Sequence, residues 1–345
     1  MSIERVRAWL EQQGADVAVV TRPASVAYLT GVFVNPHERL LALAITPTEA
    51  VLVLPELERE RAAGTSFEGV RLAGYRDGED GAALLPSSRH PAVEKGHLTL
   101  ALAERLDAVD AADLAPELRR LRMRKTPEEI ARLDLAADIT YRVLESAFAQ
   151  ARPGLSELEL TARVLLDIAE AGADVSFDPL VQSGPNSAFP HGRPGSRRLE
   201  EGDLLLVDIG AEWQGYKADL TRTRVLGDPD DRQQQLINLV QRAHDAALAV
   251  ARPGVTGAAV DAAVRRLIEE AGEGARFIHR TGHGLGLEEH EDPSFAADDQ
   301  TVLEPGMVIT VEPGVYIPGW GGIRIEDDLL VTEGGARWLG SNATG

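Results

Sequence analysis

The segment Leu199-Glu-Glu-Gly-Asp-Leu-Leu-Leu-Val-Asp208 has a second copy further along the chain, Leu303-Glu-Pro-Gly-Met-Val-Ile-Thr-Val-Glu312. Both copies begin with leucine and end nine positions later in a carboxylate that follows an apolar run. A glycine-containing turn and a second strand-like run come next, and they hold another acid, Asp219 in the first copy and Glu326 in the second. This pattern is typical of a β-hairpin with an acid on each arm.

The similarity between the two copies extends upstream. Ala151-Arg-Pro-Gly154 precedes one helical run, and Ala251-Arg-Pro-Gly254 precedes another. In the second half of the repeat, helices are expected around 232–250 and 257–271. An internal repeat of this kind determines the fold, because each copy is one structural unit. The sequence therefore predicts two related halves that face each other. Their four carboxylates would point into one cleft.

Composition limits the classes of function that this chain can have. With 345 residues, 44% hydrophobic and 26% charged, it is long enough for two globular domains. A net charge of −20 argues against a nucleic-acid partner, which requires a basic face. The chain has no cysteine, so disulfides and thiolate metal ligands are excluded. Because no apolar run approaches the roughly 20 residues of a membrane span and the start lacks a signal-peptide core, we expect a cytoplasmic protein without a membrane partner.

Two domains are expected, with a boundary just before residue 121. Residues 1–120 alternate strand-like and helical runs, which predicts an α/β domain without catalytic chemistry of its own. The second domain, 121–345, begins with a helix whose start carries a capping box, Thr126-Pro-Glu-Glu129. The strands expected in the first domain are Val17–Val20, Leu40–Ile45 and Val51–Leu54, and helical runs are expected at Glu56–Ala63 and Gly81–Leu85.

Histidines gather in two loops of the second domain. His191 lies in the Gly- and Pro-rich loop Ser183–Gly192, and His279, His283 and His290 lie within one further loop. A single histidine is more often structural than a ligand, but three so close together among glycines favour a functional site. A phosphate-binding loop is the alternative for such glycines, but the lysine and the strand–loop–helix context are missing.

Four converging carboxylates require a neutralising partner, because buried like charges cannot all ionise unaided. Surface acids on edge strands are the alternative, but Asp208 and Glu312 end runs that are too apolar for an exposed edge. A pair of divalent ions resolves the repulsion. Oxygen ligands with one imidazole suit Mn²⁺, Co²⁺, Fe²⁺ or Zn²⁺, and two such ions roughly 3.5–4 Å apart are typical of hydrolases.

Together these motifs resemble the metallopeptidases of the pita-bread fold, which include methionine aminopeptidase, aminopeptidase P and prolidase. The resemblance rests on Asp208-x-Gly, Tyr216-x-x-Asp219-x-Thr-Arg-Thr, His283-Gly-x-Gly, Glu312-Pro-Gly and Arg324-x-Glu326. It implies an α+β pita-bread C-terminal domain with an internal pseudo-two-fold repeat, preceded by an α/β N-terminal domain as in aminopeptidase P and prolidase.

The same resemblance implies roles for the individual acids. Asp208 would bind one metal ion, His283 and Glu312 the other, and Asp219 and Glu326 would bridge the two. Glu312 would also be the general base for the attacking water. Two Mn²⁺ ions are expected, with Co²⁺, Zn²⁺ and Fe²⁺ as alternatives.

Two loops are similar to those of the enzymes that cleave before proline. Ser183-Gly-Pro-Asn…Phe-Pro-His191-Gly resembles their substrate loop, and His290-Glu-x-Pro resembles their second histidine motif. His191 and His290 would contact the substrate and stabilise the tetrahedral intermediate, with His279 and Arg324 as further substrate-binding residues. The implied reaction is hydrolysis of the Xaa-Pro bond of dipeptides or short peptides by a hydroxide that two metal ions activate.

The loop Asn35-Pro-His-Glu-Arg39 is similar to the Asp-Pro-His-Glu-Arg loop that dimerisation brings to the active site of bacterial prolidases. This resemblance implies a homodimer whose N-terminal domain gates the substrate, with Arg39 pairing with a dipeptide's carboxylate. Asn35 replaces the aspartate, which leaves any charge-dependent role of that position open. An ordinary exposed loop is the alternative.

These features favour a prolidase, an Xaa-Pro dipeptidase. The first alternative is an Xaa-Pro aminopeptidase acting on longer peptides, which would share every motif above. The others are a metal-free relative similar to creatinase and a non-catalytic binding module on the same fold. The intact set of ligand residues argues against both of these.

Overall fold

The structure is a computed structural model that describes residues 2–340. It divides into two compact units, Met1–Arg122 and Met123–Gly345. The expected boundary, between residues 120 and 121, lies beside this division, and 341–345 of the expected second domain lie outside the described residues. No helix among the described residues is long and apolar enough to cross a membrane.

The first unit is built on a six-stranded mixed sheet with the strand order β4-β3-β2-β1-β5-β6. Alternate residues of β1 belong to different core clusters, Ala18 and Val20 to one and Val17 and Val19 to the other. Both faces of the sheet are therefore buried, which explains why its central strands are continuous apolar runs. The strands are β1 (Val17–Val20), β2 (Ala42–Ile45), β3 (Ala50–Pro55), β4 (Val70–Tyr75), β5 (Pro91–Val93) and β6 (Ala112–Asp113).

Helices connect these strands, and the sequence predicted two of them. The helix expected at Glu56–Ala63 is present with those bounds, and the run near Gly81 forms a short 3₁₀ helix. The strand expected from Leu40 begins two residues later. The helices are α1 (Ser2–Gln13), α2 (Pro23–Thr30), α3 (Glu56–Ala63), η1 (Gly81–Leu84), α4 (Leu100–Arg105) and α5 (Ala115–Met123).

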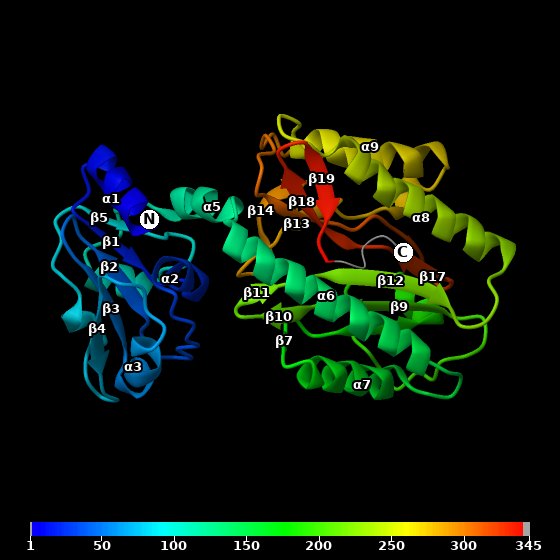
Figure 1. The fold of residues 1–345 in the computed structure, drawn as a ribbon, viewed down its shortest axis with the longest axis horizontal. Coiled ribbons are helices and arrows are strands. Elements are labelled where there is room, and N and C mark those ends of the chain that lie inside the picture. Colours follow the sequence, from blue (N-terminus) through cyan, green and yellow to red (C-terminus); the bar gives the residue numbers. More distant parts are fainter. Residues whose placement is uncertain (1, 341–345) are drawn as a thin grey trace. The chain divides into compact units, whose positions relative to one another are not determined.

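The second unit contains the sequence repeat as two similar sets of elements (Figure 1). Each half begins with two helices and continues with antiparallel strands. The Thr126 capping box is confirmed, since Thr126 Oγ1 accepts from the Glu129 amide at 3.3 Å and the Glu129 carboxylate accepts from the Thr126 amide at 2.7 Å. The first half comprises α6 (Pro127–Gln150), α7 (Glu157–Glu170), β7 (Asp174–Val175), β8 (Leu180–Ser183), η2 (Gly184–Ala188), β9 (Leu204–Ile209), β10 (Ala211–Trp213), β11 (Tyr216–Lys217) and β12 (Leu220–Val225).

The second half has the same plan. It comprises α8 (Asp231–Val250), α9 (Gly257–Glu270), η3 (Gly274–Arg276), β13 (Gly282–Gly284), β14 (Glu291–Phe295), β15 (Val308–Val311), β16 (Gly314–Ile317), β17 (Gly321–Arg324), β18 (Asp327–Thr332) and β19 (Gly335–Trp338). The sheets of this unit have the orders β12-β9-β8, β14-β13-β15-β18-β19, β11-β10-β7 and β16-β17.

The two expected hairpins are more elaborate than the sequence indicated. β9 pairs with β12, and β15 pairs with β18, but each connection forms further strands, β10 and β11 in one half and β16 and β17 in the other. Asp219 and Glu326 consequently lie immediately before the second strand of each pair rather than within it. The halves are joined where Thr221 and Glu326 form an antiparallel bridge.

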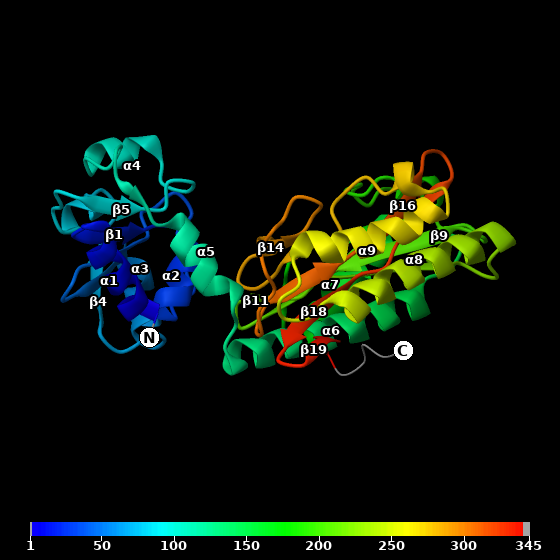
Figure 2. The ribbon, with the colours of Figure 1, turned by 90° about the horizontal axis from the view of Figure 1, so that it is seen from above.

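Helices pack on the outer faces of these strands (Figures 1 and 2). α6 and α7 share a core cluster with Val207 and Ile209 of β9, and α8 and α9 share one with Ile309 and Val311 of β15. Successive side chains of a strand point to opposite faces. The residues between these apolar positions therefore turn away from the helices.

Candidate metal centre and substrate cleft

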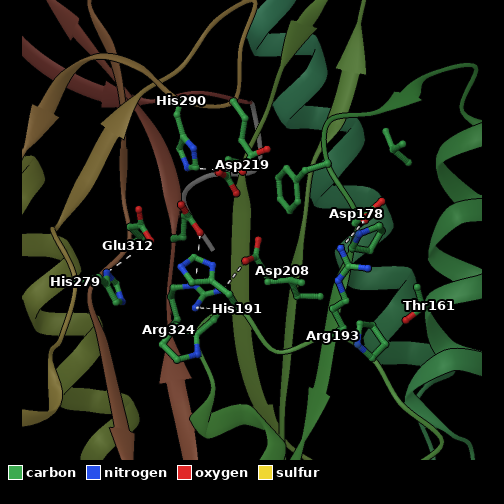
Figure 3. A pocket seen from close by; sticks show the side chains of 18 of the residues that line it. Thr161, Asp178, His191, Arg193, Asp208, Asp219, His279, His290, Glu312 and Arg324 are labelled. Carbon is green, nitrogen blue, oxygen red and sulfur yellow. Dashed lines mark hydrogen bonds and ion pairs between the residues drawn. The ribbon is translucent and has the colours of Figure 1, made fainter. Parts of the chain in front are cut away.

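A cavity of about 670 Å³ lies in the second unit, and the five expected metal ligands line it (Figure 3). The four further C-terminal residues expected to bind substrate line the same cavity. Arg39 belongs to the other unit and is treated separately below. The lining residues predicted from the sequence are Asp208, Asp219, His283, Glu312 and Glu326, together with His191, His279, His290 and Arg324.

Strand alternation explains why these acids share one cavity. In β9, Val207 and Ile209 face the helices, so Asp208 between them faces the cavity. Ile323 and Ile325 likewise pack in the second half's core and leave Glu326 on the cavity side. In both cases the acid is next in sequence to apolar residues that pack against the helices, so its side chain points to the opposite side, toward the cavity.

The centre of the cluster is suited to a metal ion. Asp219, His283 and Glu326 are buried, and each offers a ligand atom within 4.8 Å of the others. Nε2 of His283 lies 3.6 Å from Asp219 Oδ2 and 3.6 Å from Glu312 Oε1. Nδ1 of His283 donates to the Gly284 carbonyl at 3.1 Å, which leaves Nε2 free as a ligand. Burial lowers the pKa of His283 to about 3, so the imidazole is neutral, as a metal ligand must be.

The pKa values of the carboxylates shift in the opposite direction. Burial, and then the charges of Glu326 and Asp208, raise the pKa of Asp219 well above its usual value. Burial and the neighbouring acids raise the pKa of Glu326 in the same way, and burial raises that of Glu312 to about 7. Oδ1 of Asp208 is buried without a hydrogen-bond partner among the described residues. Divalent cations would remove the repulsion and give this oxygen a partner, so the donor set fits a metal site.

Arg324 links several residues of the cleft. Its guanidinium forms an ion pair with Asp208, and its Nε donates to Thr221 Oγ1 at 3.1 Å. Thr221 in turn donates to Glu326 Oε2 at 2.6 Å. Nη1 of Arg324 donates to Tyr316 Oη at 2.9 Å. Arg324 is 3% exposed, so it acts as a buried positive charge among the acids.

The three other histidines occupy different positions around the cluster. The ring of His290 packs edge-on against that of His283, with centroids 4.1 Å apart, while His191 lies on the side of Asp208 and Arg324 (Figure 3). Both His191 and His290 are exposed within the cavity. Both rings are therefore accessible to a substrate, and Nε2 of His290 also lies 3.6 Å from Glu289 Oε1.

His279 is more constrained than the resemblance implied. Its Nδ1 lies 2.8 Å from the Arg280 carbonyl, and its Nε2 lies 2.9 Å from Tyr316 Oη. Burial lowers the pKa of His279 to about 4, so the ring is neutral. The structure brings His279 to the cavity with both nitrogens already engaged, and substrate binding by this residue stays a prediction.

Arg39 lies in the N-terminal unit. Its guanidinium forms two hydrogen bonds with Asp77, at 2.8 and 3.1 Å, and an ion pair with Glu38 at 2.9 Å. The structure thus gives Arg39 partners within its own unit. Its contact with a dipeptide's carboxylate stays a prediction.

Thr221 and Tyr316 belong to the hydrogen-bond network of the cleft, and the sequence did not single them out as functional. The feature of the sequence that could have identified them is their position in the two-residue alternation of a strand. Thr221 follows Asp219 by two positions, and Tyr316 is the one polar side chain in the β16 run Gly-Val-Tyr-Ile. Period-two alternation places a residue two positions from a ligand on the ligand's own face.

Comparison with known proteins identifies the family. Residues 131–333 match metallopeptidase family M24, and residues 2–124 match the creatinase/prolidase N-terminal domain. The chain belongs to metallopeptidase family M24. It is therefore a peptide hydrolase, and the predicted resemblance and fold class are both confirmed, with an α/β N-terminal domain and a pita-bread catalytic domain.

Individual relatives of this M24 peptidase match over nearly the whole chain. An uncharacterized peptidase of Staphylococcus saprophyticus is 39% identical over 342 residues, which cover 97% of each chain. The prolidase from Pyrococcus furiosus has a TM-score of 0.89 and 34% identity, covering 96% of this chain and 98% of its own. The X-Pro aminopeptidase from Thermotoga maritima has a TM-score of 0.86 and 31% identity, covering 95% and 96%.

Metal binding to the stripped M24 peptidase is expected to release protons and to strengthen as pH rises. The carboxyls of Asp219 and Glu326 have raised pKa values without metal, so the ion displaces protons from them, whereas neutral His283 has none to lose at Nε2. Calorimetric titration of Mn²⁺ in two buffers of different ionisation enthalpy counts the protons released. Identical apparent binding enthalpies in the two buffers would mean that no protons are released. That result would contradict the raised pKa values of Asp219 and Glu326.

Proposed function

We propose that this metallopeptidase is an Xaa-Pro dipeptidase, a prolidase. The observation that carries the proposal is the convergence of His191 and His290, from different halves of the repeat, on one cavity with the complete ligand set. These two histidines stand in the motifs that resemble the proline-specific enzymes. The structural relatives include the prolidase from Pyrococcus furiosus, and the activity in its name supports the proposal.

The five ligands would hold two divalent ions, Asp208 at one, His283 and Glu312 at the other, with Asp219 and Glu326 between them. Such ions, when bound, polarise a carbonyl and lower the pKa of water. Mn²⁺ is the metal proposed, because carboxylate-rich sites with one imidazole accept it, and Co²⁺, Zn²⁺ and Fe²⁺ are the alternatives.

The protein's own residues would perform the proton transfers and the positioning. Glu312, whose pKa burial raises to about 7, takes the proton of the attacking water and is poised to return it to the leaving proline nitrogen. His191 and His290 donate hydrogen bonds to the carbonyl oxygen as negative charge develops there. Arg324 fixes the orientation of the Asp208 carboxylate.

The preference for dipeptides over longer peptides is the finer part of the proposal. An Xaa-Pro aminopeptidase remains the second candidate, because a named aminopeptidase is nearly as similar in structure as the prolidase. The loop Asn35–Arg39 is the proposed length gate, and we propose that a homodimer brings it to the cleft. A cytoplasmic location also stays a prediction.

A matched pair of substrates, Ala-Pro and Ala-Pro-Ala, tests this function. We expect the Mn²⁺-reconstituted protein to cleave the dipeptide and to leave the tripeptide largely intact. Replacing Arg39 with alanine should weaken Ala-Pro hydrolysis, mainly through KM, by removing the proposed partner of the substrate carboxylate. Efficient tripeptide cleavage would establish the aminopeptidase instead. Failure to cleave either peptide with metal bound would overturn proline specificity.

A further inference from the structure

The loop that carries His191 is tied at both ends to a single buried side chain. Residues 183–195, named here the His191 loop, leave β8 and return toward the start of α7. Glu157, the first residue of α7, is 0% exposed and lies beneath this loop. It does not belong to the set of residues that line the cavity.

The Glu157 carboxylate accepts hydrogen bonds from three residues of the loop. Oε1 accepts from the Ser183 amide and the Ser183 hydroxyl, each at 2.8 Å. The Asn186 side-chain amide donates to both oxygens, at 3.1 and 3.2 Å, and the Gly195 amide donates to Oε2 at 2.9 Å. The donors thus lie on both sides of His191 in sequence.

This arrangement is not needed to cap the helix. Ser156 and Glu159 already form the capping box of α7, with the Ser156 hydroxyl accepting from the Glu159 amide at 3.2 Å. The Glu157 carboxylate is a separate, buried acceptor, and the loop's donors offset its desolvation. Charge-assisted hydrogen bonds to backbone amides are among the stronger ones. Glu157 therefore helps to hold the loop, together with Gln182, whose side-chain amide donates to the Phe189 carbonyl at 2.8 Å.

We propose that Glu157 is a positioning residue for substrate binding, because it holds the His191 loop in the conformation that presents His191 to the metal centre. This inference rests on the proposed function, in which His191 donates to the substrate. Glu157 acts only through the loop. Its loss should loosen residues 183–195 and misplace His191 while the metal ligands stay in place.

The variant Glu157→Gln tests the proposal directly. Glutamine keeps the size of the side chain, but its NH₂ group would face the donors of Asn186 or Gly195. We expect kcat/KM for Ala-Pro to fall by up to about 100-fold, because a misplacement of about 1 Å in a group that contacts the substrate can cost that much. Hydrogen exchange of the 183–195 peptide should become faster, and bound Mn²⁺ per chain should not change. Glu159→Gln, on the same helical turn but exposed, is the control and should leave both readouts unchanged.

A double-mutant cycle with His191→Ala separates positioning from a general structural effect. If Glu157 acts through His191, Glu157→Gln should cost almost nothing further in kcat/KM when His191 is already alanine. Additive losses would overturn the proposal, as would unchanged exchange of the loop in Glu157→Gln. If His191→Ala alone keeps full kcat/KM, the proposed use of His191 is wrong and the inference falls with it, even where the loop exchanges faster.

Discussion

Replacing Glu312 with glutamine is expected to lower kcat for Ala-Pro hydrolysis by about 10²–10⁴-fold, the contribution of a well-placed general base. The wild-type carboxyl is buried, and in the metal-free protein burial raises its pKa to about 7. Glutamine has nearly the same shape but cannot accept the proton of the attacking water. The measurement is steady-state kinetics of Mn²⁺-loaded protein with the metal content determined in the same sample.

Metal content separates the two ways in which this variant can fail. Glu312 is also a proposed ligand, and its Oε1 lies 3.6 Å from His283 Nε2. A variant that keeps both ions but loses turnover supports the general base. A variant that loses one ion assigns the effect to ligation instead. Glu304→Gln, at an exposed ion pair with Arg124, is the control for removing a carboxylate from this half of the chain. Full activity of Glu312→Gln with both ions bound would exclude Glu312 as the base.

The repeat made the core of the site predictable from the sequence. Side chains along a strand alternate between its two faces. Packing Val207 and Ile209 against the helices therefore also places Asp208 in the cleft. The helix at Glu56–Ala63 was predictable for a similar reason, since its local signals do not depend on distant contacts. Local periodicity therefore determined which side chains face the cleft.

Contacts between distant segments were not predictable in this way. The glycine-rich connections form the local hairpins β10–β11 and β16–β17, and β10 also pairs with β7, more than 30 residues earlier in the chain. The hydrogen bond from Thr221 to Glu326 joins residues 105 positions apart. The sequence did not single out Glu157, because its partners come from a loop that folds back over it. Such roles depend on tertiary structure.

Next to Glu326, half-buried Arg222 of β12 and buried Asp327 of β18 form an ion pair that joins the two halves of the repeat. The guanidinium donates to both Asp327 oxygens, at 2.8 and 3.0 Å, and also to the Glu326 carbonyl at 2.7 Å. The Tyr141 hydroxyl donates to the same carboxylate, and His244 Nε2 lies 3.1 Å from it. One carboxylate therefore contacts side chains from α6, β12 and α8.

Replacing Asp327 with alanine is expected to lower the free energy of unfolding by about 3–5 kcal/mol, because removing one member of a buried pair leaves the others uncompensated. The control is Glu145→Ala. Glu145 lies on α6, the helix of Tyr141, and forms an exposed ion pair with Arg224 of β12, the strand of Arg222. Exposed pairs contribute about 0–1 kcal/mol. Urea unfolding of both metal-free variants, followed by circular dichroism, measures the difference without any contribution from bound ions. Equal losses in the two variants would mean that Asp327 is no more than a surface partner. A large loss confined to Asp327→Ala would establish it as the residue that fixes the two halves, and with them the Glu326 backbone, in register.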